Sequence, residues 1–359
     1  MGSGTTLIAA QALGRAAHGF DLDPLAVTLA KAGTTRKSSS RLGEAAAVVL
    51  EKAREYKKGS TKRELLAQIS WADRQFINYW FPERSQIELS AISAAIREQK
   101  DHQTREFLWA TFSNLIVAKS AGASFALDLA RSRPHRVLSK PVAWPFEIWQ
   151  QRTRRVLAGV DAWGSLPEGP SAKALCGDAR SLPVQDESVD FVLTSPPYLH
   201  AIDYIRAHKF ALVWMGSELS ELRTLRSVMI GAERGLFSRN GLPDKIESKV
   251  ERSGRSTEAR TRRYLSDLHS VLAETGRVLK VGGCAVFVMG DSIVNAQKRD
   301  SDSILRVLAE DVGLAFVGAE SRKLKNNRRS LPPPNAVSAA NSLWKRMRRE
   351  IFVALCKLG

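Results

Sequence analysis

The chain has 359 residues, of which 44% are hydrophobic, and carries 54 Lys and Arg against 37 Asp and Glu, a formal net charge of +17. This length predicts a core domain with a large insert, or two domains. Because no apolar run approaches the roughly 18 residues of a membrane-spanning helix and no signal-peptide pattern opens the chain, we predict a cytoplasmic protein without a membrane partner. The positive charge favours a polyanionic partner, although basic solvated surfaces are about as common.

The first 35 residues predict a glycine turn followed by a helix, a short strand and a second helix. Gly2–Thr6 forms the turn, and residues 17–20 form a strand that ends at Asp21. Glycines at such a turn let the backbone approach a ligand, and the helix N-terminus offers free N–H donors. An acidic residue about 20 residues after the turn can bind the ribose hydroxyls of a nucleoside cofactor. A plain turn followed by a helix-capping aspartate is the structural alternative.

Residues 36–171 predict a mainly helical insert. Helical periodicity covers residues 44–56, 62–71, 85–98 and 104–120, whereas the proline-rich stretch 132–170 predicts irregular structure. Between Arg131 and Arg155, seven Lys and Arg are mixed with Trp144, Phe146 and Trp149. That mixture suits phosphate contacts with base stacking, and it suits an ordinary helix face equally well. A second basic run, between residues 322 and 349, contains nine Lys and Arg and no acid.

From residue 172 onward the pattern is that of an α/β protein. The predicted strands cover residues 173–176, 189–193, 284–289, 314–317 and 350–356, and the predicted helices cover 264–279 and 304–311. A glycine pair at residues 282–283 predicts a turn, and residues 216–263 predict a charged surface excursion. Strands that alternate with helices predict a mostly parallel, doubly wound sheet, with ligands at the carboxyl ends of its strands. The predicted parts are therefore 1–35, 36–171 and 172–359.

The segment Thr194–Tyr198 carries the strongest chemical signal. Two prolines fix its backbone and remove two N–H donors, so that carbonyl oxygens remain as acceptors. Ser195 adds a hydroxyl, and Tyr198 adds a flat face. Such acceptors could hold the hydrogens of a base amino group and free its lone pair for in-line attack on a methyl sulfonium. The structural alternative is a proline-terminated strand with an incidental tyrosine.

Asp178 also follows a predicted strand, residues 173–176. A carboxylate at the end of that strand could accept a hydrogen bond from an adenine amino group. The alternative, a cap on a helix or turn, explains the residue equally simply.

Gly2–Thr6, Asp21, Gly177–Ala179 and Thr194–Tyr198 together resemble the motifs of the amino-group (N4-cytosine and N6-adenine) DNA methyltransferases. The resemblance implies the class I methyltransferase fold, a Rossmann-like doubly wound α/β sheet, with S-adenosyl-L-methionine as cofactor and DNA as partner. It implies that cofactor is bound by Gly2, Ser3, Gly4, Thr5, Asp21, Asp178 and Thr194. It implies catalytic roles for Ser195, Pro196, Pro197 and Tyr198, which would hold a base flipped out of the duplex. Ser195 favours cytosine-N4, since Asp or Asn in its place is typical of adenine-N6 enzymes.

Two departures from that family's pattern shape the expectations. The family's glycine turn follows a strand ending in Asp-Pro-Phe, so we expect that the first strand is missing before Met1, through a misassigned start or a truncated gene. The helical insert lies between the cofactor and catalytic motifs, an order that makes 36–171 a candidate for target recognition. Residues 216–263 are the competing candidate. A restriction endonuclease is a candidate partner.

Two other functions remain open on the sequence. The first is an RNA guanine-N2 methyltransferase, since such enzymes have the same fold and a similar Pro-Pro-Tyr motif. The second is an inactive, truncated remnant that binds nucleic acid, which would also explain the positive charge. No metal is expected, because Cys176, Cys284 and Cys356 have no metal-ligand spacing and the six histidines form no cluster. The cysteines are predicted to be small buried residues.

Overall fold

The computed structural model describes residues 1–117, 122–127, 129, 134–162, 170, 172–198, 203–232, 242, 246, 255–290, 292–294, 297–299, 301–324 and 349–359. The chain divides into two compact units. Unit 1 comprises Met1–Cys176 and Ile202–Arg226, and unit 2 comprises Gly177–Ala201 and Ser227–Gly359. Most of the second basic run, from residue 325 to residue 348, lies outside the described residues.

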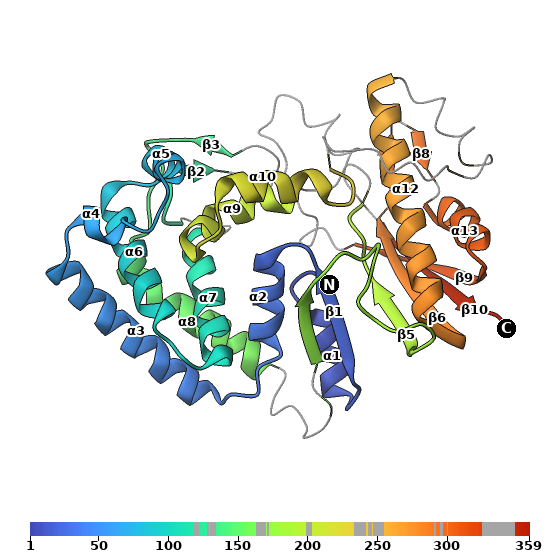
Figure 1. Cartoon of the computed structure of the whole chain (residues 1–359), viewed down its shortest axis with the longest axis horizontal. Helices are drawn as coiled ribbons and strands as arrows, with labels where there is room; N and C mark the ends of the chain where they lie inside the picture. The colour runs from blue at the N-terminus through green and yellow to red at the C-terminus, as the bar shows by residue number, and fades with distance from the viewer. Residues whose placement is uncertain are drawn as a thin grey trace. The chain divides into compact units, whose positions relative to one another are not determined.

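The N-terminal part of unit 1 is a small α/β layer (Figure 1). Its elements are α1 (Thr5–Ala12), β1 (Ala17–Asp21), α2 (Pro24–Gly33) and β4 (Ala172–Cys176). β1 and β4 pair in parallel, from Ala17 opposite Ala172 to Asp21 opposite Cys176. Leu7, Ala30 and Ala174 form the buried contact between the helices and the strands. The pairing therefore places Asp21 at the carboxyl end of a parallel strand pair.

Helices make up most of the rest of unit 1. They are α3 (Ser39–Gly59), α4 (Lys62–Leu65), α5 (Trp71–Trp80), α6 (Glu83–Arg97), α7 (His102–Ile116), α8 (Pro145–Asp161), α9 (Tyr204–Met215) and α10 (Leu219–Val228), whose last two residues belong to unit 2. A short antiparallel pair, β2 (Ala126–Leu127) and β3 (His135–Arg136), accompanies them. The division into units differs from the boundaries predicted at residues 35 and 171. Helix α9 belongs to unit 1 because Phe210 packs edge-on against Phe76 and Trp214 against Phe81, with ring centroids 5.0 and 5.2 Å apart.

Helix α8 overturns the prediction that residues 132–170 are irregular. Pro145 stands at the start of the helix, where a proline costs no hydrogen bond. Trp149, Arg152 and Thr153 are buried at helical spacing, so this stretch has an inward face that its proline content concealed. The Trp149 indole N–H donates to the Ala46 carbonyl of α3 at 2.8 Å, which fixes α8 in the core.

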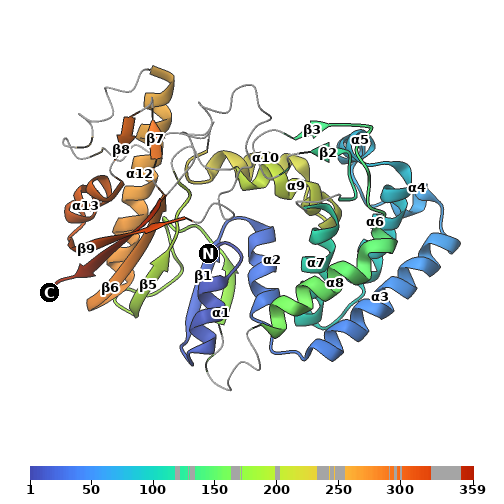
Figure 2. The same cartoon turned by 180° about the vertical axis from the view of Figure 1, so that it is seen from behind.

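The main sheet of unit 2 has the strand order β5-β6-β10-β9 (Figure 2). The strands are β5 (Val189–Thr194), β6 (Leu279–Gly290), β9 (Leu314–Lys323) and β10 (Arg349–Lys357), and a separate short pair is formed by β7 (Ser292–Val294) and β8 (Gln297–Arg299). β5 is parallel to β6, whereas β10 is antiparallel to both β6 and β9. The sheet is therefore mixed, and the predicted α/β class is confirmed.

Helices α12 (Arg255–Val278) and α13 (Ser301–Asp311) cover one face of this sheet. Leu268 of α12 and Leu308 of α13 are fully buried with Phe287 of β6 and Val353 of β10. Side chains from two helices and two strands thus form one core, which holds α12 and the end of β5 within the same packed unit.

Two details of β6 correct the sequence predictions. The strand begins at Leu279, before the glycine pair that was predicted to precede it, and its pairing with β5 is irregular between Leu279 and Cys284, where Gly282 has φ of 79°. Cys284 lies opposite Cys356 of β10, with Cα atoms 4.2 Å apart, and the two form a disulfide. The prediction of three small buried cysteines was wrong: Cys176 is exposed, and the other two form a bond that strand pairing across 72 residues sets up and local sequence does not show. Cys176 is the free cysteine.

Neither a membrane-spanning helix nor a cluster of metal-binding side chains occurs among the described residues. No helix there has both the length and the apolar character that crossing a bilayer requires. Nor, within the same ranges, do three or more His, Cys, Asp and Glu side chains gather in a way that would hold a metal ion.

Candidate active site

The glycine turn and Asp21 meet in unit 1. The Gly2 N–H donates to Asp21 Oδ2 at 2.8 Å, and the Asp23 N–H donates to Oδ1 at 3.0 Å. The α-amino group of Met1 lies 3.5 Å from the same Oδ2. The Asp21 side chain remains 20% exposed, so a hydroxyl group from solvent can still reach the carboxylate. Ser3 and Thr5 are exposed beside it, at the N-terminus of α1.

Gly4 is needed for the shape of the turn. It caps α1 in the left-handed conformation, with φ of 85°. A Cβ atom at this position would lie 2.6 Å from the Ala30 Cβ of α2, closer than atoms of packed side chains approach. The turn therefore requires glycine for two reasons, its dihedral angle and the close packing of α2.

We expect Gly4→Ala to lower the free energy of unfolding by about 2–4 kcal/mol, since it combines a left-handed strain with overpacking. Gly14→Ala is the matched control, because Gly14 also has positive φ, 67°, but no atom within 4 Å of its added Cβ. That change should cost only about 1 kcal/mol. Urea unfolding curves of both variants would measure the difference, and equal costs would show that the contact with Ala30 is unimportant.

Two side chains near this turn escaped the sequence analysis. Asp23 is 2% exposed and caps α2 through the Leu25 N–H at 2.9 Å, while its Oδ2 contacts His208 Nδ1 of α9. Tyr204 lies one turn before His208 and is half exposed, and its partial burial, then the charge of Asp21, raise the pKa of its hydroxyl. In the sequence, Tyr204 and His208 are four residues apart, and this spacing on one helix face could have indicated that they lie together.

The segment predicted to be catalytic lies in unit 2, directly after β5. Thr194 is the last residue of the strand. Ser195 is exposed, Pro196 is buried, and Pro197 and Tyr198 are half-buried. The Ser195 Oγ and Tyr198 Oη atoms are 3.2 Å apart and share a hydrogen bond. The prolines thus bring a hydroxyl acceptor and an aromatic ring to the same side of the turn.

Asp178 lies in a tight turn with Arg180. The Arg180 backbone N–H donates to Asp178 Oδ1 at 2.9 Å, and the guanidinium Nη2 donates to Oδ2 at 2.7 Å. Burial works to raise the pKa of Asp178, but the hydrogen bonds and charge of Arg180 outweigh it, so the pKa lies below its ordinary value. Sequence analysis missed Arg180, although it stands only two residues after Asp178.

Of the predicted site residues, Gly2, Ser3, Gly4, Thr5 and Asp21 belong to unit 1, whereas Asp178, Thr194, Ser195, Pro196, Pro197 and Tyr198 belong to unit 2. Two groups are brought together within their own units. They are the glycine turn with Asp21, and Ser195 with Tyr198.

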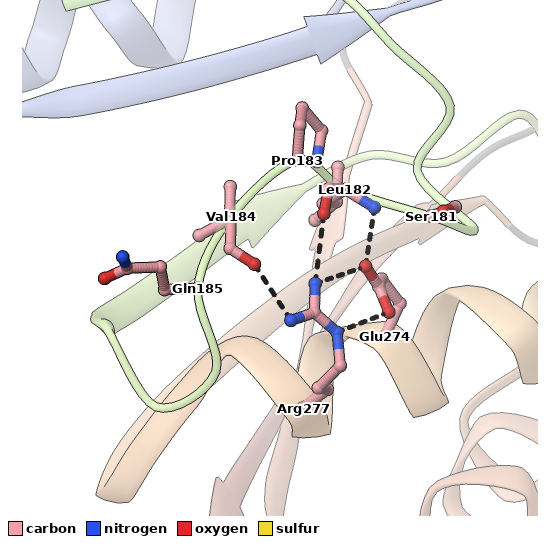
Figure 3. A pocket seen from close by; sticks show the side chains of 7 residues that line it. All are labelled: Ser181, Leu182, Pro183, Val184, Gln185, Glu274 and Arg277. Carbon is pink, nitrogen blue, oxygen red and sulfur yellow. Dashed lines mark hydrogen bonds and ion pairs between the residues drawn. The ribbon is translucent and has the colours of Figure 1, made fainter.

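A surface pocket of unit 2 is lined by residues 181–185 together with Glu274 and Arg277 (Figure 3). Arg277 donates to the carbonyls of Leu182 and Val184 at 3.0 and 2.8 Å and to both oxygens of Glu274. The side chains of Arg277 and Glu274 point toward one another (Figure 3), and their polar groups bind the backbone of the loop and so hold it against α12. We therefore interpret this pocket as part of the packing between the loop and α12, and we assign no ligand to it.

The aromatic residues of the basic stretch 131–155 are also engaged within unit 1. Trp149 is fully buried, which excludes it from stacking on a base. The guanidinium of Arg84 lies 4.6 Å from the ring centre of Trp144, and Lys57 Nζ lies 5.3 Å from that of Phe146. The helix-face interpretation therefore explains these three residues better than nucleic-acid stacking does.

Comparisons with known proteins bear on the whole chain. No protein-family profile matches it. It is 25% identical over 366 residues to the type II methyltransferase M.MvaI of Kocuria varians, covering 94% of this chain and 78% of that protein. It is 22% identical over 199 residues to the type II methyltransferase M.MjaII of Methanocaldococcus jannaschii, covering 49% of this chain and 36% of that protein.

Solved structures were compared as well. TTHA0409 of Thermus thermophilus, a proposed DNA modification methylase solved in complex with S-adenosyl-L-methionine, shares 18% identity and a TM-score of 0.26. The match covers 51% of this chain and about half, 52%, of TTHA0409. The two sequence relatives show that the chain is related to type II methyltransferases, and the predicted resemblance to DNA methyltransferases is confirmed.

Proposed function

We propose that the protein transfers a methyl group from S-adenosyl-L-methionine to the exocyclic amino group of a DNA base, with cytosine-N4 favoured over adenine-N6. The observation that carries the proposal is the segment after β5, where Ser195 and Tyr198 share a hydrogen bond at the carboxyl end of a strand. The similarity to M.MvaI across 94% of the chain supports it. The formal charge of +17 suits a DNA substrate.

The residues of the turn and of Asp178 fit an adenosyl cofactor chemically. Asp21 keeps an exposed carboxylate edge that can accept the two ribose hydroxyls, and the N-terminus of α1 carries Ser3 and Thr5. Asp178 can accept from an adenine amino group. Gly2 and Gly4 would border the ligand through their backbones, and Thr194 is proposed as a cofactor residue because the family resemblance implies it. When bound, the cofactor supplies an electrophilic methyl group on a sulfonium sulfur.

The catalytic residues act by positioning and electrostatics. Ser195 Oγ and the carbonyl oxygens next to Pro196 and Pro197 accept the amino hydrogens of the target base. Tyr198 stacks on the base, which is turned out of the duplex. Because the amino hydrogens are held, the nitrogen lone pair would leave ring conjugation and be available to take the methyl group that a bound cofactor would supply. The carbon–sulfur bond would break as the nitrogen–carbon bond forms, and the amino nitrogen would lose one proton to solvent. Ser195, in place of an acid or amide, favours cytosine.

Target recognition is proposed for the helical residues 36–171, with 216–263 as the competing segment. Both carry Lys and Arg that can contact phosphates. A restriction endonuclease that cuts the same sequence would be the partner in a restriction-modification pair.

Methyl transfer from labelled cofactor tests the proposal. Duplex DNA and tRNA would be offered in parallel, and the modified nucleosides identified by mass spectrometry. We expect N4-methylcytosine in DNA, and its loss in Ser195→Ala. N6-methyladenine in DNA would correct the base alone. Label in tRNA at guanine-N2 would establish the RNA methyltransferase alternative, and the absence of cofactor binding in calorimetry would favour the inactive remnant.

A further inference from the structure

The side chain of Arg180 joins three segments of unit 2. Its Nη1 donates to Asp267 Oδ1 of α12 at 2.6 Å, and its Nη2 donates to the Val228 carbonyl at 2.7 Å. Its Nε and Nη2 also hold Asp178. The Asp267 side chain is only 2% exposed, so it needs a charged partner, and Arg180 provides one. The guanidinium is therefore fixed from several sides before any ligand approaches Asp178.

The contacts with Arg180 leave one acceptor position on the Asp178 carboxylate. Three N–H groups donate to it, namely the backbone N–H of Arg180, Nη2, and Nε, which is shared between Oδ1 at 3.0 Å and Oδ2 at 3.1 Å. A carboxylate accepts about four hydrogen bonds. The Asp178 side chain is 29% exposed, so a ligand can reach the remaining position.

Arg180 also determines what that position can accept. It stabilises the ionised form of Asp178, and an ionised carboxylate accepts hydrogen bonds but donates none. A purine with an amino group at its 6-position supplies the missing donor. A purine with hydrogen at that position displaces water from the carboxylate but donates no hydrogen bond in return. The unpaired acceptor then lowers the affinity for that purine strongly.

We propose that Arg180 is a positioning residue that fixes the Asp178 carboxylate as an obligate acceptor and so makes this part of the site select a 6-aminopurine. The inference rests on the proposed function, in which Asp178 meets the adenine of the cofactor. A purely structural role for Arg180 would weaken every adenosyl-type ligand equally. A positioning role changes the preference between two ligands that differ only at the purine 6-position.

The test measures dissociation constants of the full chain by calorimetry for two ligands. One is S-adenosyl-L-homocysteine, and the other is its analogue with hydrogen in place of the 6-amino group. We expect the wild-type protein to prefer the amino compound about 10- to 100-fold, the range of one hydrogen bond to a charged group. Arg180→Lys keeps a positive charge beside Asp267 but loses the forked contact with Asp178. Its preference should fall to within about threefold.

Arg277→Lys is the matched control. Arg277 also uses its guanidinium on a carboxylate and on backbone carbonyls of unit 2, but it touches Glu274 instead of Asp178. Its variant should keep the wild-type preference, with thermal unfolding showing that both variants fold. Asp178→Ala should lose the preference, because it removes the acceptor itself.

Three results would overturn the proposal. A folded Arg180→Lys protein with the wild-type preference would remove the role of Arg180. Equal wild-type affinity for both ligands would show that Asp178 does not meet the 6-amino group, while the proposed methyl transfer would stand. Failure of the wild-type protein to bind either ligand would overturn the inference together with the proposed function.

Discussion

Asp21→Ala is expected to raise the dissociation constant for S-adenosyl-L-methionine about 100-fold or more. The carboxylate would accept the ribose hydroxyls, and charge-assisted hydrogen bonds of this kind contribute about 1.5–3 kcal/mol each. The same substitution frees the Gly2 and Asp23 N–H groups, which both donate to Asp21 in the present structure. The turn would therefore lose its order together with its ligand contact. Calorimetric titration of the cofactor measures the change.

Two further variants separate ligand binding from stability. Asp101 caps α7 through the Thr104 N–H at 2.9 Å, so Asp101→Ala removes a comparable carboxylate cap far along the sequence. It should cost about 1 kcal/mol of folding free energy and leave cofactor affinity unchanged. Asp21→Asn keeps one acceptor oxygen and should have an intermediate affinity. An unchanged dissociation constant in Asp21→Ala would refute the assigned role.

Tyr198→Ala is expected to lower kcat/KM for DNA methylation about 100-fold and leave the dissociation constant for the cofactor within about twofold. Stacking of a base on an aromatic ring contributes about 1–3 kcal/mol, and a misplaced target base loses near-attack geometry as well. Tyr198→Phe keeps the ring and removes the hydroxyl that shares a hydrogen bond with Ser195, so we expect a loss of about tenfold or less. Steady-state kinetics on duplex DNA measure both.

Tyr79→Ala is the matched control for this series. Tyr79 is 51% exposed, and the Arg136 guanidinium lies 4.4 Å from the centre of its ring. Like Tyr198, it is a tyrosine at the surface with a polar neighbour. Its removal should leave kcat/KM near the wild-type value. A parallel loss of cofactor binding and methylation in Tyr198→Ala would mean that Tyr198 serves the fold.

Local sequence predicted the parts of the candidate site that depend on local geometry. The glycine turn, the strand ending at Asp21 and the proline segment after β5 are each contained in a few consecutive residues, and the structure has them as expected. Arg180 depends on Asp267 and Val228, which are brought to it by packing. Such partners have no fixed spacing, so they could not be found without the fold.

The errors share one physical cause. In each case the prediction followed the local amino-acid composition, whereas the secondary structure depends on packing with distant parts of the chain. The prolines around α8 suggested irregular chain, yet Pro145 begins a helix whose buried face holds Trp149. Gly282 and Gly283 suggested a turn that ends before the strand, yet β6 begins at Leu279 and includes both glycines where its pairing with β5 is irregular. The pairing of β6 with β10 likewise places Cys284 opposite Cys356, which composition alone does not predict.

The division of the chain into two units has a practical consequence for the design of fragments. Each unit is assembled from two separate stretches, and the backbone passes from one to the other after Cys176, after Ala201 and after Arg226. A fragment that stops at Arg226 holds all of unit 1 but only Gly177–Ala201 of unit 2, with Ser195 and Tyr198 severed from β6. Neither unit can be produced as an uninterrupted fragment. Dissecting the contributions of the two units therefore calls for point substitutions or circularly permuted genes, and simple truncation would mislead.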